Sequence, residues 1–142
     1  MHNILIDFVW PYDDDLILLS RYICRERGYR MQQFETFRAI YEHWQNQLPT
    51  VVVVKRTLYE LNDGLAFCAD IRANPQFSDV PIIVGWADMP RQHFEEAYAT
   101  GANGCFGRVF NIGGLFHMIE ALAINPTKRG LVDQGNPFNL PA

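Results

Sequence analysis

The chain has 142 residues, a net charge of −4, and a composition in which 49% of the residues are hydrophobic and 20% are charged. These values predict one globular domain with its own core, and the negative charge argues against a nucleic-acid-binding surface, which is normally basic. We see no apolar run of membrane-spanning length and no leader pattern at the N-terminus, so we expect a cytoplasmic protein with no membrane partner.

Five apolar segments alternate with helical patterns along the chain. We expect strands at 3–9, 29–33, 51–54, 80–86 and 103–107, and helices at about 15–27, 34–45, 64–73, 90–100 and 112–124. Strands that alternate with helices predict a parallel sheet covered by helices on both faces. The four valines at 51–54 are apolar on both sides, which is typical of a central, fully buried strand.

Polar residues mark several helix ends. One aspartate of 13–15 is expected to cap the first helix, Gly28 to end it, and Asp63 and Asn111 to cap later helices. The buried stripe predicted for the first helix is Leu16, Leu19, Ile23 and Cys24, and the stripe predicted for the second helix is Phe37, Ile40, Tyr41 and Trp44. Residues 126–142 are rich in Pro, Gly and Asn and are expected to form a tail, which Leu131, Phe138 and Leu140 could dock.

The cysteines and histidines suggest no special chemistry. Cys24, Cys68 and Cys105 are few and far apart, so we expect buried thiols rather than a disulfide framework. The four histidines lack ligand spacing, and we therefore expect no metal site built from them and no cofactor.

Three signatures at the predicted strand ends resemble the receiver domain of two-component response regulators. They are the acidic loop 13–15 before a helix that ends in Arg-Gly-Tyr at 27–29, Asp63-Gly64-Leu65 followed by 71–75 and 80–84, and Gly101-Ala102-Asn103-Gly104 followed by 107–110. The resemblance covers nearly all of residues 3–124. It implies an α/β, flavodoxin-like, three-layer fold with a five-stranded parallel sheet in the order 2-1-3-4-5, a receiver-like domain at 1–125, and a tail at 126–142.

Active members of that family hold Mg²⁺ with two acids after the first strand and accept a phosphoryl group on an aspartate that ends the third. A Ser or Thr ends their fourth strand, and a Lys-Pro pair follows the fifth. The corresponding positions here are Lys55 or Arg56 for the acceptor, Trp86 for the hydroxyl, Arg108 for the lysine, and Asp7, Asp13 and Asp14 as candidates for the acids. The acceptor remains ambiguous because counting from Pro49 gives Lys55, whereas counting back from Asp63 gives Arg56.

These substitutions remove the chemistry of the phosphorylation switch. Lysine and arginine side chains only donate hydrogen bonds, so they can neither form an acyl phosphate nor bind Mg²⁺. We therefore expect a degenerate pseudo-receiver. One hypothesis is that Lys55 or Arg56 neutralises Asp7, Asp13 or Asp14; the alternative is that both cations are solvated loop residues.

The expected function is a non-enzymatic signalling module that binds another signalling protein or forms a homodimer. The resemblance implies a docking face on the fourth helix, fifth strand and fifth helix, here with Arg91, Phe94, Glu95, Tyr98, Phe110, Phe116 and His117. The alternative is that half of these residues simply belong to the core. One alternative is an active response regulator with a relocated acceptor, such as Asp63. Another is a flavin- or nucleotide-binding enzyme, which is disfavoured because the acidic loop after the first strand has no glycine to approach a phosphate.

Overall fold

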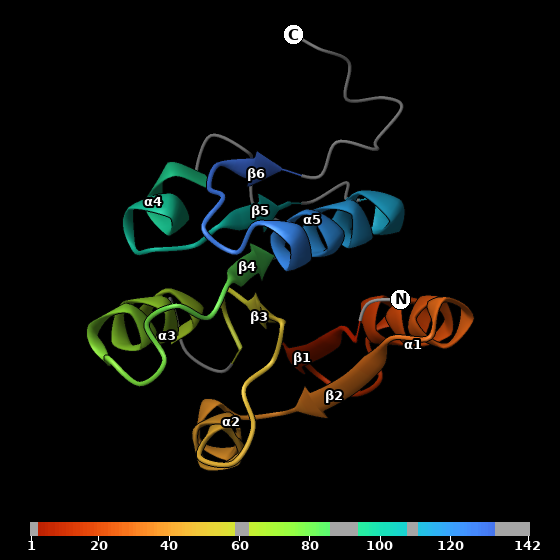
Figure 1. Ribbon diagram of the computed structural model, residues 1–142, viewed down its shortest axis with the longest axis horizontal. Helices are drawn as coiled ribbons and strands as arrows, with labels where there is room; N and C mark the ends of the chain where they lie inside the picture. The colour runs from red at the N-terminus through yellow and green to blue at the C-terminus, as the bar shows by residue number, and fades with distance from the viewer. Residues whose placement is uncertain (1–2, 59–62, 86–93, 108–110, 133–142) are drawn as a thin grey trace, which may run out of the picture.

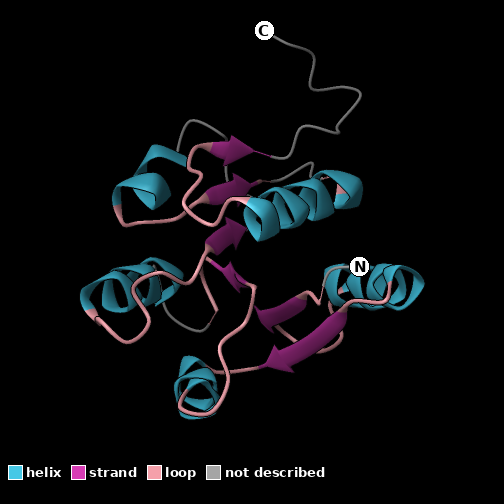
Figure 2. Ribbon diagram, viewed as in Figure 1, coloured by secondary structure: helices cyan, strands magenta, loops and turns pink. Residues whose placement is uncertain are grey.

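A computed structural model describes residues 3–58, 63–85, 94–107 and 111–132 of the chain. It shows a wholly parallel sheet with helices on both faces (Figures 1 and 2). The elements are β1 (Leu5–Val9), α1 (Asp15–Arg27), β2 (Arg30–Phe34), α2 (Phe37–Trp44), β3 (Val51–Lys55), α3 (Asp63–Ala73), β4 (Ile82–Gly85), α4 (Phe94–Ala99), β5 (Gly104–Phe106), α5 (Ile112–Ile124) and β6 (Leu131–Val132). The predicted flavodoxin-like α/β fold is confirmed.

The sheet has one strand more than predicted. Its order is β2-β1-β3-β4-β5-β6, so the first five strands follow the predicted order and β6 adds to the edge of β5. Leu131 lies beside Gly104, and Val132 beside Cys105. The sheet therefore extends past residue 125 into the segment that we expected to be a tail, and Leu131 is one of the residues expected to dock it.

The valine strand is central, as predicted. All four valines of 51–54 have no solvent exposure, and their side chains alternate between two cores. Val52 and Val54 pack with α2, α3 and α4 on one face of the sheet, whereas Val51 and Val53 pack with α1 and α5 on the other (Figure 1). Each face of β3 thus holds one helical layer in place.

The ends of α1 are as predicted, but the set of residues that it buries against the sheet differs from the prediction. Asp14 caps the helix by accepting from the backbone N–H of Leu16 at 2.9 Å, and Gly28 ends it with a φ of 73°. The buried residues are Leu16, Ile17, Ser20 and Cys24. Leu19, predicted to be buried, is 47% exposed, because the helix packs on the sheet with the small side chain of Ser20 facing inwards.

The aromatic stripe of α2 belongs to the core, as predicted. Thr36 caps this helix by accepting from the N–H of Ala39 at 3.1 Å, so the helix begins later than expected and Phe34 belongs to β2. Ile40 and Trp44 are buried. The rings of Phe37 and Tyr41 pack on Phe67 of α3, with centroids 4.7 and 5.6 Å away.

All three cysteines are free and buried, as expected. Burial raises the pKa of the Cys24 thiol to about 11 and the pKa values of the Cys68 and Cys105 thiols to about 12. Thiols of such high pKa carry almost no thiolate at neutral pH and are poor nucleophiles. In the part of the chain that the structure describes, no helix is both long and apolar enough to cross a membrane.

Candidate functional site at the carboxyl edge of the sheet

The ends of four parallel strands meet at one edge of the sheet. Val9 of β1 lies beside Val54 of β3, Lys55 lies beside Gly85 of β4, and Gly85 lies beside Phe106 of β5. Trp10 and Arg56 follow β1 and β3 at this edge. In open α/β sheets, ligands bind at the carboxyl ends of the strands, so this edge is the candidate functional site.

Two aromatic rings fill the edge on the side of α1 and α5. Trp10 is 4% exposed, Phe106 is 1% exposed, and their rings stack with centroids 5.9 Å apart. The first residue after β1 is thus a buried indole rather than an acid. The acidic residues of the loop come only after Pro11, close to the start of α1.

Phe106 requires the glycine beside it. A Cβ added to Gly85 would lie 2.1 Å from Cζ of the Phe106 ring. Real atoms do not approach so closely, so the ring occupies the space that a side chain at this position would need. Gly85 also accepts, through its carbonyl, from the N–H of Arg56 at 2.9 Å.

Gly85→Ala should destabilise the fold by about 2 kcal/mol, because an extra methyl group in a packed core forces the surrounding side chains to move. Urea unfolding followed by tryptophan fluorescence measures this change. In a double variant with Phe106→Leu, the added methyl should cost much less than it does alone, since the smaller side chain leaves room. If Gly85→Ala lowered the free energy of unfolding equally with Phe106 and with Phe106→Leu, the clash with the Phe106 ring would be contradicted.

Arg56 holds the end of β3 to α3 and α4. Its side chain is 10% exposed, and Nη2 donates to Oε1 of Glu96 in α4 at 2.8 Å. Its carbonyl accepts from the N–H of Gly64 at 2.7 Å. A Cβ on Gly64 would lie 2.4 Å from the carbonyl oxygen of Lys55, so this close approach of α3 to the strand end depends on glycine.

The predicted ion pair between a strand-end cation and the acids is wrong for Arg56, which binds Glu96 instead. Lys55 is half-buried and makes no ion pair with another described residue. Asp13 is exposed in the loop, and Asp14 caps α1. The reason is geometric, because Trp10 and Pro11 separate the loop acids from the ends of the strands.

Asp7 lies away from this edge. It is two residues before the end of β1 and has no solvent exposure, and its Oδ2 accepts from the indole N–H of Trp44 at 2.8 Å. Burial raises the pKa of Asp7 from 3.8 to about 6, although the hydrogen bond from Trp44 and the nearby His43 oppose the increase. Asp7 is therefore part of the contact between β1 and α2, not part of an acidic pocket in the loop.

The predicted docking face requires a correction. Phe94 and Phe116 are buried, one in each core, because each helix turns these rings towards the sheet. Tyr98 is half-buried, and its hydroxyl donates to the carbonyl of Leu131 in β6 at 2.6 Å. Glu95 and His117 are exposed. Trp86, Arg91, Arg108 and Phe110 lie outside the described residues, so the predictions for them stay predictions.

Sequence reasoning missed Arg72, which joins several elements at the opposite edge of the sheet. Its guanidinium donates to the carbonyls of Gly101, Ser78 and Val80 and to Oδ1 of Asn103, at 2.8 to 2.9 Å. Asn103 also accepts from the N–H of Ile82 and donates to the carbonyl of Lys128, which precedes β6. The only signal in the sequence is the Gly-Ala-Asn-Gly motif at 101–104, whose partners lie far away along the chain.

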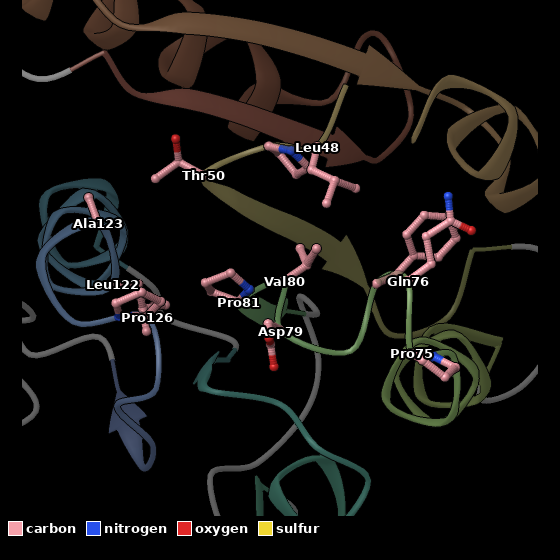
Figure 3. Close-up of a pocket in the computed structure, with 12 residues that line it drawn as sticks. Leu48, Thr50, Pro75, Gln76, Asp79, Val80, Pro81, Leu122, Ala123 and Pro126 are labelled. Atoms are coloured by element: carbon pink, nitrogen blue, oxygen red, sulfur yellow. The ribbon is translucent and has the colours of Figure 1, made fainter. Parts of the chain in front are cut away.

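A hollow of about 360 Å³ lies at the amino edge of the sheet (Figure 3). It is lined by the loop before β3, the loop between α3 and β4, and the end of α5, with Leu48, Val80, Pro81 and Leu122 among its walls. This hollow is at the opposite end of β3 from Lys55 and Arg56. It therefore belongs to a different surface from the positions that correspond to a phosphorylation site.

Several solved structures are similar to this fold over most of the chain. The signal receiver domain of a DNA-binding response regulator from Colwellia psychrerythraea 34H matches with a TM-score of 0.74 and 17% identity, covering 87% of this chain and 100% of that one. This chain has the fold of a receiver domain. A LuxR-family two-component response regulator from Aurantimonas sp. SI85-9A1 shares the receiver fold with a TM-score of 0.74 and 19% identity, covering 90% and 89% of the two chains.

A third structure with the receiver fold is the receiver domain of a sensor histidine kinase from Pseudomonas aeruginosa PAO1, which has a magnesium ion coordinated in its active-site cleft. It matches with a TM-score of 0.70 and 19% identity, covering 87% of this chain and 100% of that one. No protein-family model and no curated protein matches the chain. At these identities, the structural similarity establishes the fold.

The described residues at the carboxyl edge of this receiver fold do not fit Mg²⁺. The ion needs several oxygen ligands around one point. Arg56 and Lys55 offer only donors, Asp7 is held under Trp44, and Asp14 is used by the helix cap. Within the described ranges, no group of three or more His, Cys, Asp or Glu side chains could hold a metal ion.

Proposed function

We propose that this chain is a non-enzymatic signalling module with a receiver fold that acts by binding a protein partner and does not accept a phosphoryl group. The observation that carries the proposal is the pair of cations, Lys55 and Arg56, at the end of β3. A phosphoryl acceptor at this position must be a carboxylate. Arg56 instead donates to Glu96 of α4 at 2.8 Å.

The stacked rings beside this position support the same proposal. An acyl phosphate and its metal ion need space and water at the strand ends. Trp10 and Phe106 fill that space on one side with buried rings, and the Phe106 ring also occupies the space beside Gly85. Such a packed edge suits a fixed shape better than a site that binds and releases a small anion.

A second candidate function is that of an active response regulator with Asp63 as a relocated acceptor. Asp63 is the first residue of α3 and lies beside Gly64, which donates to the carbonyl of Arg56. It therefore lies close to the end of β3 in space. We place this function second because the Asp63 carboxylate already accepts from the N–H of Leu58 at 2.8 Å and so links the start of α3 to the segment that follows β3.

A two-dimensional amide NMR titration with Mg²⁺, followed by beryllofluoride, tests the proposal. Beryllofluoride mimics a phosphorylated aspartate, so a chain without a working acceptor should show no specific shifts at the ends of β3, β4 and β5. Saturable shifts that spread from β3 to β5 would contradict the proposal. Their loss in Asp63→Asn would then identify the relocated acceptor.

A further inference from the structure

The outer face of α1 is unusually apolar for a surface helix. Among the described residues, Leu18, Leu19 and Tyr22 are 54%, 47% and 61% exposed, and Tyr12 in the preceding loop is 53% exposed. Leu18 and Tyr22 are four residues apart and so lie next to each other on one side of the helix. Figure 1 shows α1 at the periphery of the molecule, beside β2 and α5. The face opposite to its buried stripe therefore has no partner among the described elements.

Opposite charges stand at the two ends of this face. Asp15 is in the first turn of α1 and Arg25 in the last turn, and both are exposed. Neither makes an ion pair with any other described residue. The other arginines differ, since Arg21 donates to Gln33 at 2.9 Å and Arg27 donates to Glu120 at 2.7 Å. Asp15 and Arg25 thus remain available for a partner.

We propose that this face pairs with the α1 helix of a second copy of the chain, antiparallel, around a two-fold axis that passes the helix at the level of residue 20, on the side opposite the buried Ser20 side chain. In a two-fold interface, residue i contacts residue j of the partner and j contacts i. Asp15 and Arg25 lie equally far from residue 20 on either side, and so do Leu18 and Tyr22. One arrangement therefore pairs opposite charges at both ends and apolar side chains in the middle.

The charges also select the direction of the pairing. A parallel pair of α1 helices would place Asp15 against Asp15 and Arg25 against Arg25, which is repulsive at both ends. The antiparallel pair also places the positive helix N-terminus near the negative C-terminus of its partner. A helix of this length spans roughly 20 Å, so the interface falls in the class of small, transient contacts and the dimer should depend on concentration.

This inference names a partner for the protein-binding module proposed above, and so rests on that function in part, but its test uses assembly alone. Sedimentation equilibrium of the full chain over a range of concentrations should show reversible dimers. Asp15→Arg and Arg25→Asp should each weaken dimerisation by roughly tenfold or more, because each places like charges together at both ends of the interface. The double variant should dimerise again.

Mixing the two single variants gives the sharpest result. Each variant alone should be mainly monomeric, whereas the mixture should form heterodimers, because every pair then unites Arg with Asp. Arg38→Asp, on the exposed surface of α2, is the matched control and should dimerise like the unaltered chain. Thermal unfolding verifies that each variant is folded, since reversed charges at helix ends cost only about 0.3–1 kcal/mol each.

A monomer at all concentrations would overturn the inference and leave the α1 face to a different protein. Dimers that form equally well in both single charge-reversal variants would also overturn it by placing the interface elsewhere. So would a mixture of the two variants that dimerises no more than either variant alone. Neither result involves a phosphoryl group. A failed dimer test therefore leaves the proposed lack of phosphorylation to be decided by the beryllofluoride titration.

Discussion

Asp7→Asn should stabilise the fold by about 3 kcal/mol at pH 8 and change it little below pH 4. Asp7 is fully buried, and burial raises its pKa from 3.8 to about 6. Between these values, the folded chain keeps a proton that the unfolded chain has released. The stability of the unaltered chain therefore falls as pH rises through this interval and stays low above it.

Asparagine removes this dependence because it has the shape of aspartic acid but cannot ionise. Its side-chain oxygen can still accept from the indole N–H of Trp44, as Oδ2 of Asp7 does at 2.8 Å. The measurement is urea unfolding of both proteins from pH 4 to pH 8, followed by tryptophan fluorescence. The difference in unfolding free energy should grow between pH 4 and pH 6 and then level off.

His43 requires a control because its charge acts on the Asp7 carboxyl and lowers the pKa of that group. The same comparison is therefore repeated in a His43→Gln background, where the effect of Asp7→Asn should persist. An effect of Asp7→Asn that is the same at every pH would show that the charge of Asp7 costs the fold nothing. In that case, the hydrogen bond to Trp44 alone would account for its position.

Arg72→Met should destabilise the fold by about 3 kcal/mol, since it leaves several partly buried acceptors without their donor. The guanidinium donates to three backbone carbonyls and to Asn103, at 2.8 to 2.9 Å. Asn103 in turn binds the N–H of Ile82 and the carbonyl of Lys128. The loss should therefore reach the turn that leads into β6.

Two measurements test this prediction. Urea unfolding gives the loss of stability, and amide hydrogen exchange should become faster at Leu131, whose N–H donates to the carbonyl of Asn103 at 3.1 Å. Arg38→Met is the matched control because Arg38 is exposed, and its change should stay within about 0.5 kcal/mol. An equally small change for Arg72→Met would mean that solvent replaces its hydrogen bonds at no cost.

Local patterns were sufficient to predict much of the fold. The run of valines at 51–54 has apolar side chains on both faces, and it forms the central, buried strand. Gly28 and Asn111 end and cap their helices as predicted, because these features depend on a residue's own backbone preference or on a hydrogen bond to a near neighbour. The stripe of α2 follows helical spacing and packs into the core.

The candidate site was predicted only in part. The sequence placed Lys55 and Arg56 at the end of β3, and the structure agrees. It could not predict that Arg56 would bind Glu96, because the two residues meet only when α4 packs against the sheet. Nor could it predict that Trp10 would stack on Phe106, since Trp10 follows β1 and Phe106 ends β5, far away along the chain.

By itself, the sequence determined the alternation of strands and helices, the central strand and the absence of a carboxylate at the end of β3. These depend on side-chain type and on spacing within one element. Only the tertiary structure decided that Ser20 rather than Leu19 faces the core, that Asp7 lies under Trp44, and that Leu131 extends the sheet. Each of these depends on contacts between residues distant in the chain, whose free energy outweighs local preference once the helices pack on the sheet.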